Sequence, residues 1–371
     1  MKKISEDYLL RMAVSKKSHL RKLRSVRIIY PVLIGLGVVV FMFLRKFEPE
    51  VFRSINFDRK SVFWIIIAIV LMAIRDLGYM IRLKILSDKK FSWRQTFRII
   101  MLWEFTSAIT PSAIGGTSVA IIFVNKEGLK LGKASAIVMA TSFLDELYFI
   151  LAFPLILLFI SGHRLFHITG IDGSNLAFAN EFFLFAIIGY SIKLIYTLAL
   201  SYGLFFNPRG LKWLLLWVFK LPILRRWRSE ANEAGYDIIK SSNELRRKSF
   251  RFWLKAFGAT ILSWTSRYWV INALFLAFFV VPDHFLVFAR QLAAWIMMLV
   301  SPTPGGSGFS EYVFIRYFGE LLQVAPEVKG SFAAVLALLW RMISYYPYLL
   351  IGTIIFPRWI RMRFGSGSAN H

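Results

Sequence analysis

Charged side chains lie inside several long apolar stretches of this sequence. They are Arg75, Asp76, Glu104, Asp145, Glu146, Lys193, Arg267 and Arg341. If these stretches cross a membrane, an ionised group costs at least about 2.5–3.5 kcal/mol at the bilayer centre, so we expect these side chains to face the protein interior. Lys193, Arg267 and Arg341 lie near the middle of their stretches, whereas Arg75 lies closer to an end and can extend toward the interface.

The cationic side chains near the middle of these stretches outnumber the carboxylates at the same depth. This excess of positive charge predicts an anionic ligand. The alternative is ion pairing inside the protein, for instance of Asp145 or Glu146 with Arg341 or Lys193.

Two segments interrupt apolar stretches with proline and glycine: TPSAIGGTS (110–118) and SPTPGGSGFSE (301–311). Backbone groups freed by such a break cost several kcal/mol each in hydrocarbon, so a break persists where protein or a watery cavity satisfies them. The pairs Gly115–Gly116 and Gly305–Gly306 allow close approach and positive φ, and the helix ends they create carry partial charges. The backbone N–H groups at the N-terminal ends of such helices favour binding of a phosphate. The alternative is close helix packing through small residues.

Glu104 and Glu311 flank these two segments. One interpretation is functional: these carboxylates bind protons or an amine headgroup. The other is structural: they cap helices and form ion pairs. The sequence supports both interpretations. His163 and His167 are too few for a metal site. The chain has no Cys, no Walker A loop and no G-x-S-x-G element, so we expect no thiolate chemistry, no ATP hydrolysis, no cofactor and no catalytic residues.

Composition indicates a polytopic membrane protein. The 371 residues are 57% hydrophobic, and the mean hydropathy is +0.57. The net charge is +25, but the basic residues cluster in loops that flank apolar stretches. This pattern is typical of insertion orientation and contact with anionic headgroups, so we expect no nucleic-acid partner.

The basic loops also predict the topology. Lys and Arg gather in 1–27, 81–98, 207–251 and after 357, which we place in the cytoplasm, and they are sparse in 161–181, 281–289 and 317–330, which we place outside. The number of membrane crossings between loops assigned to known sides then requires that 99–124 and 285–316 each enter the membrane and return to the side from which they came. We therefore expect two re-entrant hairpins that enter from opposite faces, with both termini cytoplasmic in a multi-pass protein of the plasma membrane.

The predicted fold is all-α, with two inverted repeats of three transmembrane helices and one re-entrant Pro/Gly hairpin each. After a basic N-terminus (1–25), the first repeat (26–160) has spans 26–44, 62–80 and 134–160 around hairpin 99–124. The second repeat (182–356) has spans 182–206, 252–280 and 331–356 around hairpin 285–316, a cytoplasmic amphipathic and basic insertion (207–251), and a tail (357–371). Inverted repeats with broken helices are a recurring architecture of membrane transporters. Eight ordinary kinked spans are the alternative.

The segments TPSAIGG with NKEGLKLGKASAIV, SPTPGGSGFSE and WRMISYYPYLLIG resemble the membrane domain of lysylphosphatidylglycerol synthetases, a flippase-like family, over about residues 26–360. The family's elements fall on Pro111, Gly115, Gly116, Pro302, Pro304, Gly305, Gly306, Gly308, Glu311 and Arg341. The family's Arg after the first element is missing, and Lys126 is the nearest basic residue. Members fused to a soluble aminoacyltransferase domain move aminoacylated phosphatidylglycerol across the membrane. The resemblance implies lipid translocation, and without that domain we expect no aminoacyl-lipid synthesis.

The predicted function is translocation of an anionic, phosphate-containing lipid, either a phospholipid or a polyprenyl phosphate, without nucleotide hydrolysis. The candidate substrate-binding residues are Arg75, Glu104, Pro111, Gly115, Gly116, Lys193, Arg267, Pro302, Pro304, Gly305, Gly306, Gly308, Glu311 and Arg341. One alternative is a membrane-embedded enzyme that acts on such a lipid with Glu104, Asp145 or Glu146 as acid or base. Another is an accessory subunit of an envelope-lipid pathway.

Overall fold

The computed structural model describes residues 57–110, 112–166, 178–210, 236, 239–280, 283–298, 303 and 305–364. The predicted N-terminus (1–25), the predicted span 26–44, most of the insertion and the end of the tail lie outside the described residues, as do Pro111, Pro302 and Pro304. The described residues contain helices and no strands. The protein is therefore an all-α membrane protein.

Four described helical segments are long and apolar enough to cross a bilayer: Arg59–Leu86, Leu131–Phe159, Phe183–Phe206 and Pro326–Arg363. They correspond to α4 (Arg59–Leu86), α7 (Leu131–Phe159), α9 (Phe178–Ser201) with the π-helical turn η1 (Tyr202–Phe206), and α15 (Pro326–Ser344) with α16 (Tyr346–Phe364). α12 (Phe250–Phe278) has 29 residues but carries Arg251, Lys255 and Arg267 among them. A short helix, α8 (Gly162–Phe166), follows α7.

α4 and α12 form the centre of the molecule and pack antiparallel along their length. Near one end, the Ser61 hydroxyl donates to the Ala277 carbonyl oxygen (2.9 Å), and farther along the Ser263 hydroxyl donates to the Arg75 carbonyl oxygen (2.8 Å). Gly78 permits this approach, because a Cβ there would strike Ser263. The pair thus forms a rigid central support for the shorter helices.

The stretch predicted as the first hairpin consists of two short helices, α5 (Trp93–Ile109) and α6 (Ser112–Lys126), that pack on each other. α5 ends at Ile109, and the backbone of the next residue, Thr110, is extended (φ −99°, ψ 141°), as expected for the residue before a proline. Gly115 and Gly116 lie inside α6, so the expectation that they create the helix ends is wrong. Gly116 instead packs tightly against Ser107 of α5, which is the close approach that small residues allow.

The second Pro/Gly segment separates α13 (His284–Met297) from α14 (Phe309–Gly319). Gly305, Gly306 and Gly308 adopt positive φ of 56°, 68° and 85°. The expectation of positive φ is confirmed at Gly305 and Gly306 but not at the first glycine pair, which lies inside the α-helix α6. Three left-handed residues in so short a segment reverse the chain between the two helices.

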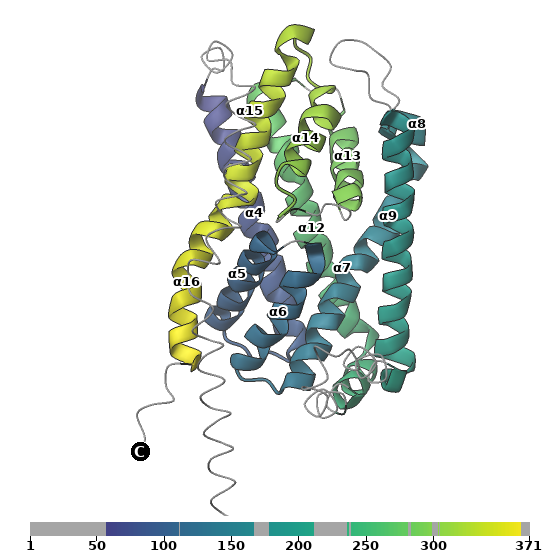
Figure 1. Ribbon diagram of the computed structural model, residues 1–371, viewed down its shortest axis with the longest axis vertical. Helices are drawn as coiled ribbons and strands as arrows, with labels where there is room; N and C mark the ends of the chain where they lie inside the picture. Colours follow the sequence, from purple (N-terminus) through teal and green to yellow (C-terminus); the bar gives the residue numbers. More distant parts are fainter. Residues whose placement is uncertain are drawn as a thin grey trace, which may run out of the picture.

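The stretch 331–356 contains a break at Tyr345 (φ −132°, ψ −56°), where α15 ends before α16 begins. Pro347 lies in the first turn of α16, where its missing N–H is tolerated, but it cannot supply the bond that would continue α15. Figure 1 shows α5 and α6 in the lower half of the molecule, α13 and α14 in the upper half, and α15 meeting α16 between these two levels.

Candidate functional site

Arg75 on α4 holds the first pair of short helices. Its guanidinium lies 2.7 Å from the Glu104 carboxylate on α5 and 2.8 Å from Asp76, and it is buried. The Tyr348 hydroxyl of α16 donates to both oxygens of Asp76 at 2.9 Å. The Arg75 guanidinium also lies over the rings of Tyr79 and Tyr348. One buried cation therefore joins α4, α5 and α16.

Arg341 on α15 holds the second pair of short helices. Its Nε donates to Glu311 at 2.6 Å, and its Nη2 donates to the Gly305 carbonyl oxygen at 3.1 Å and to the Ser310 hydroxyl. The other Glu311 oxygen accepts from the Gly308 N–H at 2.6 Å and so caps the start of α14. Gly305, Gly308, Glu311 and Arg341, predicted as site residues, are thus brought together in one hydrogen-bonded turn.

Two more buried ion pairs connect α7 to its neighbours. Lys193 of α9 lies 2.9 Å from Glu146, one of the pairings anticipated from the sequence, and it is confirmed. Asp145 binds Arg82 of α4 at 2.5 Å and accepts from the indole N–H of Trp264 at 2.7 Å. The sequence reasoning missed Arg82 because it counted this residue in a cytoplasmic loop.

Tyr345, at the break between α15 and α16, links the ends of both short-helix pairs. Its hydroxyl donates to the carbonyl oxygen of Ala108, near the end of α5, at 3.0 Å. Its ring packs directly against Gly305, where an added Cβ would overlap the ring. The Arg341 guanidinium lies 4.5 Å from the centre of the same ring. The two pairs of short helices therefore meet at one tyrosine.

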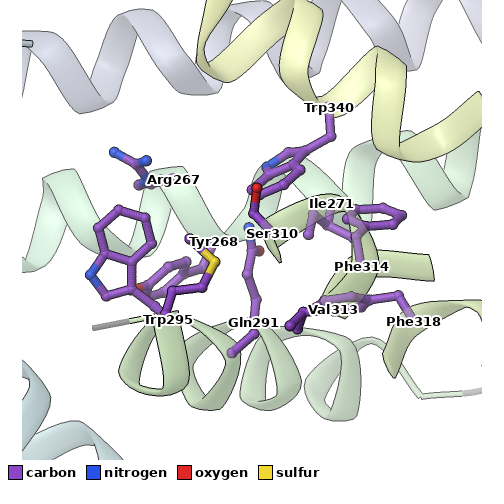
Figure 2. Close-up of a pocket in the computed structure, with 12 residues that line it drawn as sticks. Arg267, Tyr268, Ile271, Gln291, Trp295, Ser310, Val313, Phe314, Phe318 and Trp340 are labelled. Atoms are coloured by element: carbon purple, nitrogen blue, oxygen red, sulfur yellow. The ribbon is translucent and has the colours of Figure 1, made fainter. Parts of the chain in front are cut away.

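A small cavity lies between α12, α13, α14 and α15 (Figure 2). Arg267, Tyr268, Gln291, Trp295 and Ser310 line its polar side, and apolar side chains line the remainder. Gln291 and Tyr268 are buried, and the Gln291 Oε1 and the Tyr268 hydroxyl have no hydrogen-bond partner among the described residues. The cavity has room for about one water molecule, so it is closed to a lipid headgroup in this conformation.

Sequence reasoning placed Arg267 in the site but missed Gln291, Tyr268 and Tyr345. Gln291 lies on α13, a helix buried on most of its surface, and the sequence pattern did not indicate which neighbour or cavity this one polar side chain would face. In the described part of the chain, no group of three or more His, Asp and Glu residues lies close enough together to hold a metal ion.

The fold and the buried charges define a class: a polytopic helical membrane protein in which two pairs of short helices meet around buried arginines. Comparison with known proteins gives the family. The chain belongs to the family of the lysylphosphatidylglycerol synthase TM region, whose profile matches residues 28–352. It is also similar to the "UPF0104 membrane protein" of Archaeoglobus fulgidus, with 26% identity over 337 residues, 87% of this chain and 94% of the relative. The resemblance seen in the sequence motifs is thereby confirmed.

Proposed function

We propose that the protein translocates an anionic, phosphate-containing lipid across the cytoplasmic membrane without nucleotide hydrolysis. The observation that carries the proposal is the meeting of the two short-helix pairs at Tyr345, which contacts Ala108 on one side and Gly305 on the other. In alternating access the two halves of a transporter move against each other around a central site, and a contact between the two short-helix pairs is where such a movement would begin.

The two halves of the proposed transporter are inverted repeats with re-entrant hairpins α5–α6 and α13–α14. Their placement in opposite halves of the molecule supports this plan (Figure 1). Lys133, Lys248 and Arg363 lie at the end of the molecule where α6 and α16 finish. The positive-inside rule supports a cytoplasmic location for that end and for both termini.

In the proposed cycle the lipid headgroup and the first methylene groups next to it cross the protein interior, while the rest of the hydrocarbon tails remains in the bilayer. The described cavity is too small for a headgroup, so the structure corresponds to a closed state of this cycle. The helix pairs must separate at Tyr345 before a headgroup passes. α6 begins near this junction, and the partial positive charge at its N-terminus favours a passing anion, whereas the Glu311 carboxylate already caps the start of α14.

Of the candidate substrate-binding residues, we propose that Arg75, Lys193 and Arg341 position the helices, because each forms an ion pair with a carboxylate. Glu104 and Glu311 are the partners of Arg75 and Arg341. A direct role in binding the lipid falls to Arg267. The enzyme alternative is less well supported, because Glu104, Asp145 and Glu146 are each bound to a cation that would compete for the proton-accepting oxygens.

The test is a flip assay with the purified chain in liposomes that contain a trace of headgroup-labelled phosphatidylglycerol. Dithionite added outside should bleach more than the outer-leaflet fraction in protein-containing vesicles, without ATP, and the recovered lipid should be chemically intact. Labelled phosphatidylcholine, which has no net charge, serves as the comparison substrate. Bleaching equal to that of protein-free vesicles for labelled phosphatidylglycerol, or conversion of the label to a new compound, would contradict the proposal.

A further inference from the structure

Arg267 differs from the other deep cations in its partners. Arg75, Arg82, Lys193, Arg290 and Arg341 each have a carboxylate within ion-pair distance. Arg267 has none among the described residues. Its guanidinium instead lies 4.4 Å from the centre of the Trp295 ring and 5.7 Å from that of Trp264. Stacking occupies the face of a guanidinium and leaves its N–H edge available for a planar anion or a phosphate.

Two neutral polar groups face the same cavity without partners. They are the Tyr268 hydroxyl, which can donate, and the Gln291 Oε1, which accepts; the Nε2 of the same Gln291 amide is a donor. Figure 2 shows Gln291 extending between Trp295 and Ser310 into the space that Arg267 borders. One water molecule would fit here and could bond to both neutral groups. Water brings no charge, however, and so does not compensate Arg267.

The rest of the cavity wall is apolar. Ile271, Val313, Phe314 and Phe318 line the side farthest from Arg267, as seen in Figure 2. A ligand that matches both sides has an anionic group joined to a hydrocarbon chain. Free phosphate would meet Arg267, Tyr268 and Gln291 but would leave this apolar wall without a partner.

We propose that this cavity is the phosphate subsite of the lipid path: Arg267 binds the phosphate edge-on, the Tyr268 hydroxyl and the Gln291 Nε2 donate to its oxygens, and the apolar wall receives the first methylene groups of the chain. The inference rests on the proposed function and assigns the lipid's phosphate to one location in the second half of the molecule. α13 and α14 must move away from α12 to admit it, because the closed cavity holds only about one water molecule.

Native mass spectrometry of the full-length protein in detergent tests the subsite directly, because it resolves protein with and without a bound lipid. The probes are dihexanoyl phosphatidic acid, dihexanoyl phosphatidylglycerol, dihexanoyl phosphatidylcholine and inorganic phosphate. We expect the two anionic lipids to bind and Arg267→Gln to weaken that binding about tenfold or more, which is the effect of losing a charge-assisted hydrogen bond. Arg316→Gln is the matched control, because Arg316 lies half-buried on α14 and does not line the cavity.

Tyr268→Phe keeps the proposal testable if Arg267→Gln fails to fold. It removes a buried hydroxyl without a partner, so we expect unchanged or higher thermal stability together with about three- to tenfold weaker lipid binding. A purely structural role for Tyr268 would not produce these opposite effects. Equal lipid binding by Arg267→Gln, Tyr268→Phe and the native chain would overturn the proposal, and inorganic phosphate binding as tightly as the lipids would overturn the role of the apolar wall.

The flip assay separates this inference from the proposed function. If the native chain binds anionic lipid through Arg267 but does not translocate it, the subsite stands and the proposed function fails. If the native chain translocates and Arg267→Gln binds and translocates equally well, the function stands and the subsite fails.

Discussion

The Tyr345 hydroxyl donates a hydrogen bond of 3.0 Å to the carbonyl oxygen of Ala108, across 237 positions of sequence. Ala108 lies in the last turn of α5, where a helix leaves its carbonyl groups without intrahelical partners. Tyr345 marks the end of α15. One side chain therefore satisfies the free end of one helix pair while its ring supports the turn of the other. We call this hydrogen bond the latch, because we propose that it holds the two halves of the molecule together in the closed state.

Tyr345→Phe removes the latch bond and keeps the ring. A net contribution of about 0.5–1.5 kcal/mol to the closed state predicts about two- to tenfold faster translocation of labelled phosphatidylglycerol, because the latch must break before a headgroup passes. Tyr346→Phe is the control. Its hydroxyl is buried without a partner among the described residues, so its removal should leave the rate unchanged. Equal rates for the two variants would show that the bond to Ala108 does not hold the closed state.

Gly305→Ala should destabilise the junction by about 1–3 kcal/mol, because φ is positive at this position and the new Cβ would overlap the Tyr345 ring. Thermal unfolding in detergent measures the effect. Gly258→Ala is the matched change, since a Cβ there meets no atom within 4 Å and the residue lies inside α12. That variant should be slightly more stable. A similar loss of stability in both variants would contradict the tight contact at Gly305.

Arg341→Gln leaves the buried Glu311 without its cation and should cost about 3–5 kcal/mol of stability. The double variant Arg341→Gln, Glu311→Gln removes both charges and should recover much of that loss. If Arg341 only positions the turn of α14, the double variant should also regain translocation. A double variant that is stable but inactive would instead assign Arg341 to substrate binding, the role expected from the sequence.

Glu127 tests a contact outside the lipid path. Its buried carboxylate accepts from the Trp359 indole at 3.0 Å and from Arg363 at 2.5 Å, and it lies 3.4 Å from Arg98. Glu127→Gln should therefore lower stability by about 1–3 kcal/mol while leaving the translocation rate per folded molecule unchanged. Glu244→Gln is the control, because its ion pair with Lys133 is exposed and should contribute at most about 1 kcal/mol. Equal stability of the two variants would contradict a stabilising role for the contacts of Glu127 with Trp359 and Arg363.

Much of the arrangement follows from local signals in the sequence. Positive φ at Gly305 and Gly306 was predictable because glycine alone adopts it without strain. The pairing of Lys193 with Glu146 was predictable in kind, because charges at that depth need partners.

Other features depend on contacts between distant parts of the chain. The Tyr345–Ala108 bond and the orientation of Gln291 are set by how whole helices rotate against each other. An apolar face indicates which side of a helix is buried, but it does not indicate which neighbour or cavity a polar side chain on that side will face. The role of Gly115 and Gly116 was predicted wrongly because a glycine pair allows tight helix packing as well as a turn. The break between α5 and α6 is determined by the neighbouring proline instead.

Reversible cross-linking of the latch tests the account most directly. The chain contains no cysteine, so Ala108→Cys with Tyr345→Cys introduces two thiols and no others. A bifunctional maleimide with a photocleavable spacer, which the dithionite of the flip assay does not reduce, should join the helix pairs and reduce translocation of labelled phosphatidylglycerol to the rate of protein-free vesicles. Cleavage of the spacer by light before the assay should restore translocation, and Ala108→Cys alone should not respond to the reagent. Full-rate translocation by completely cross-linked protein would contradict the claim that the two helix pairs separate to let the lipid pass.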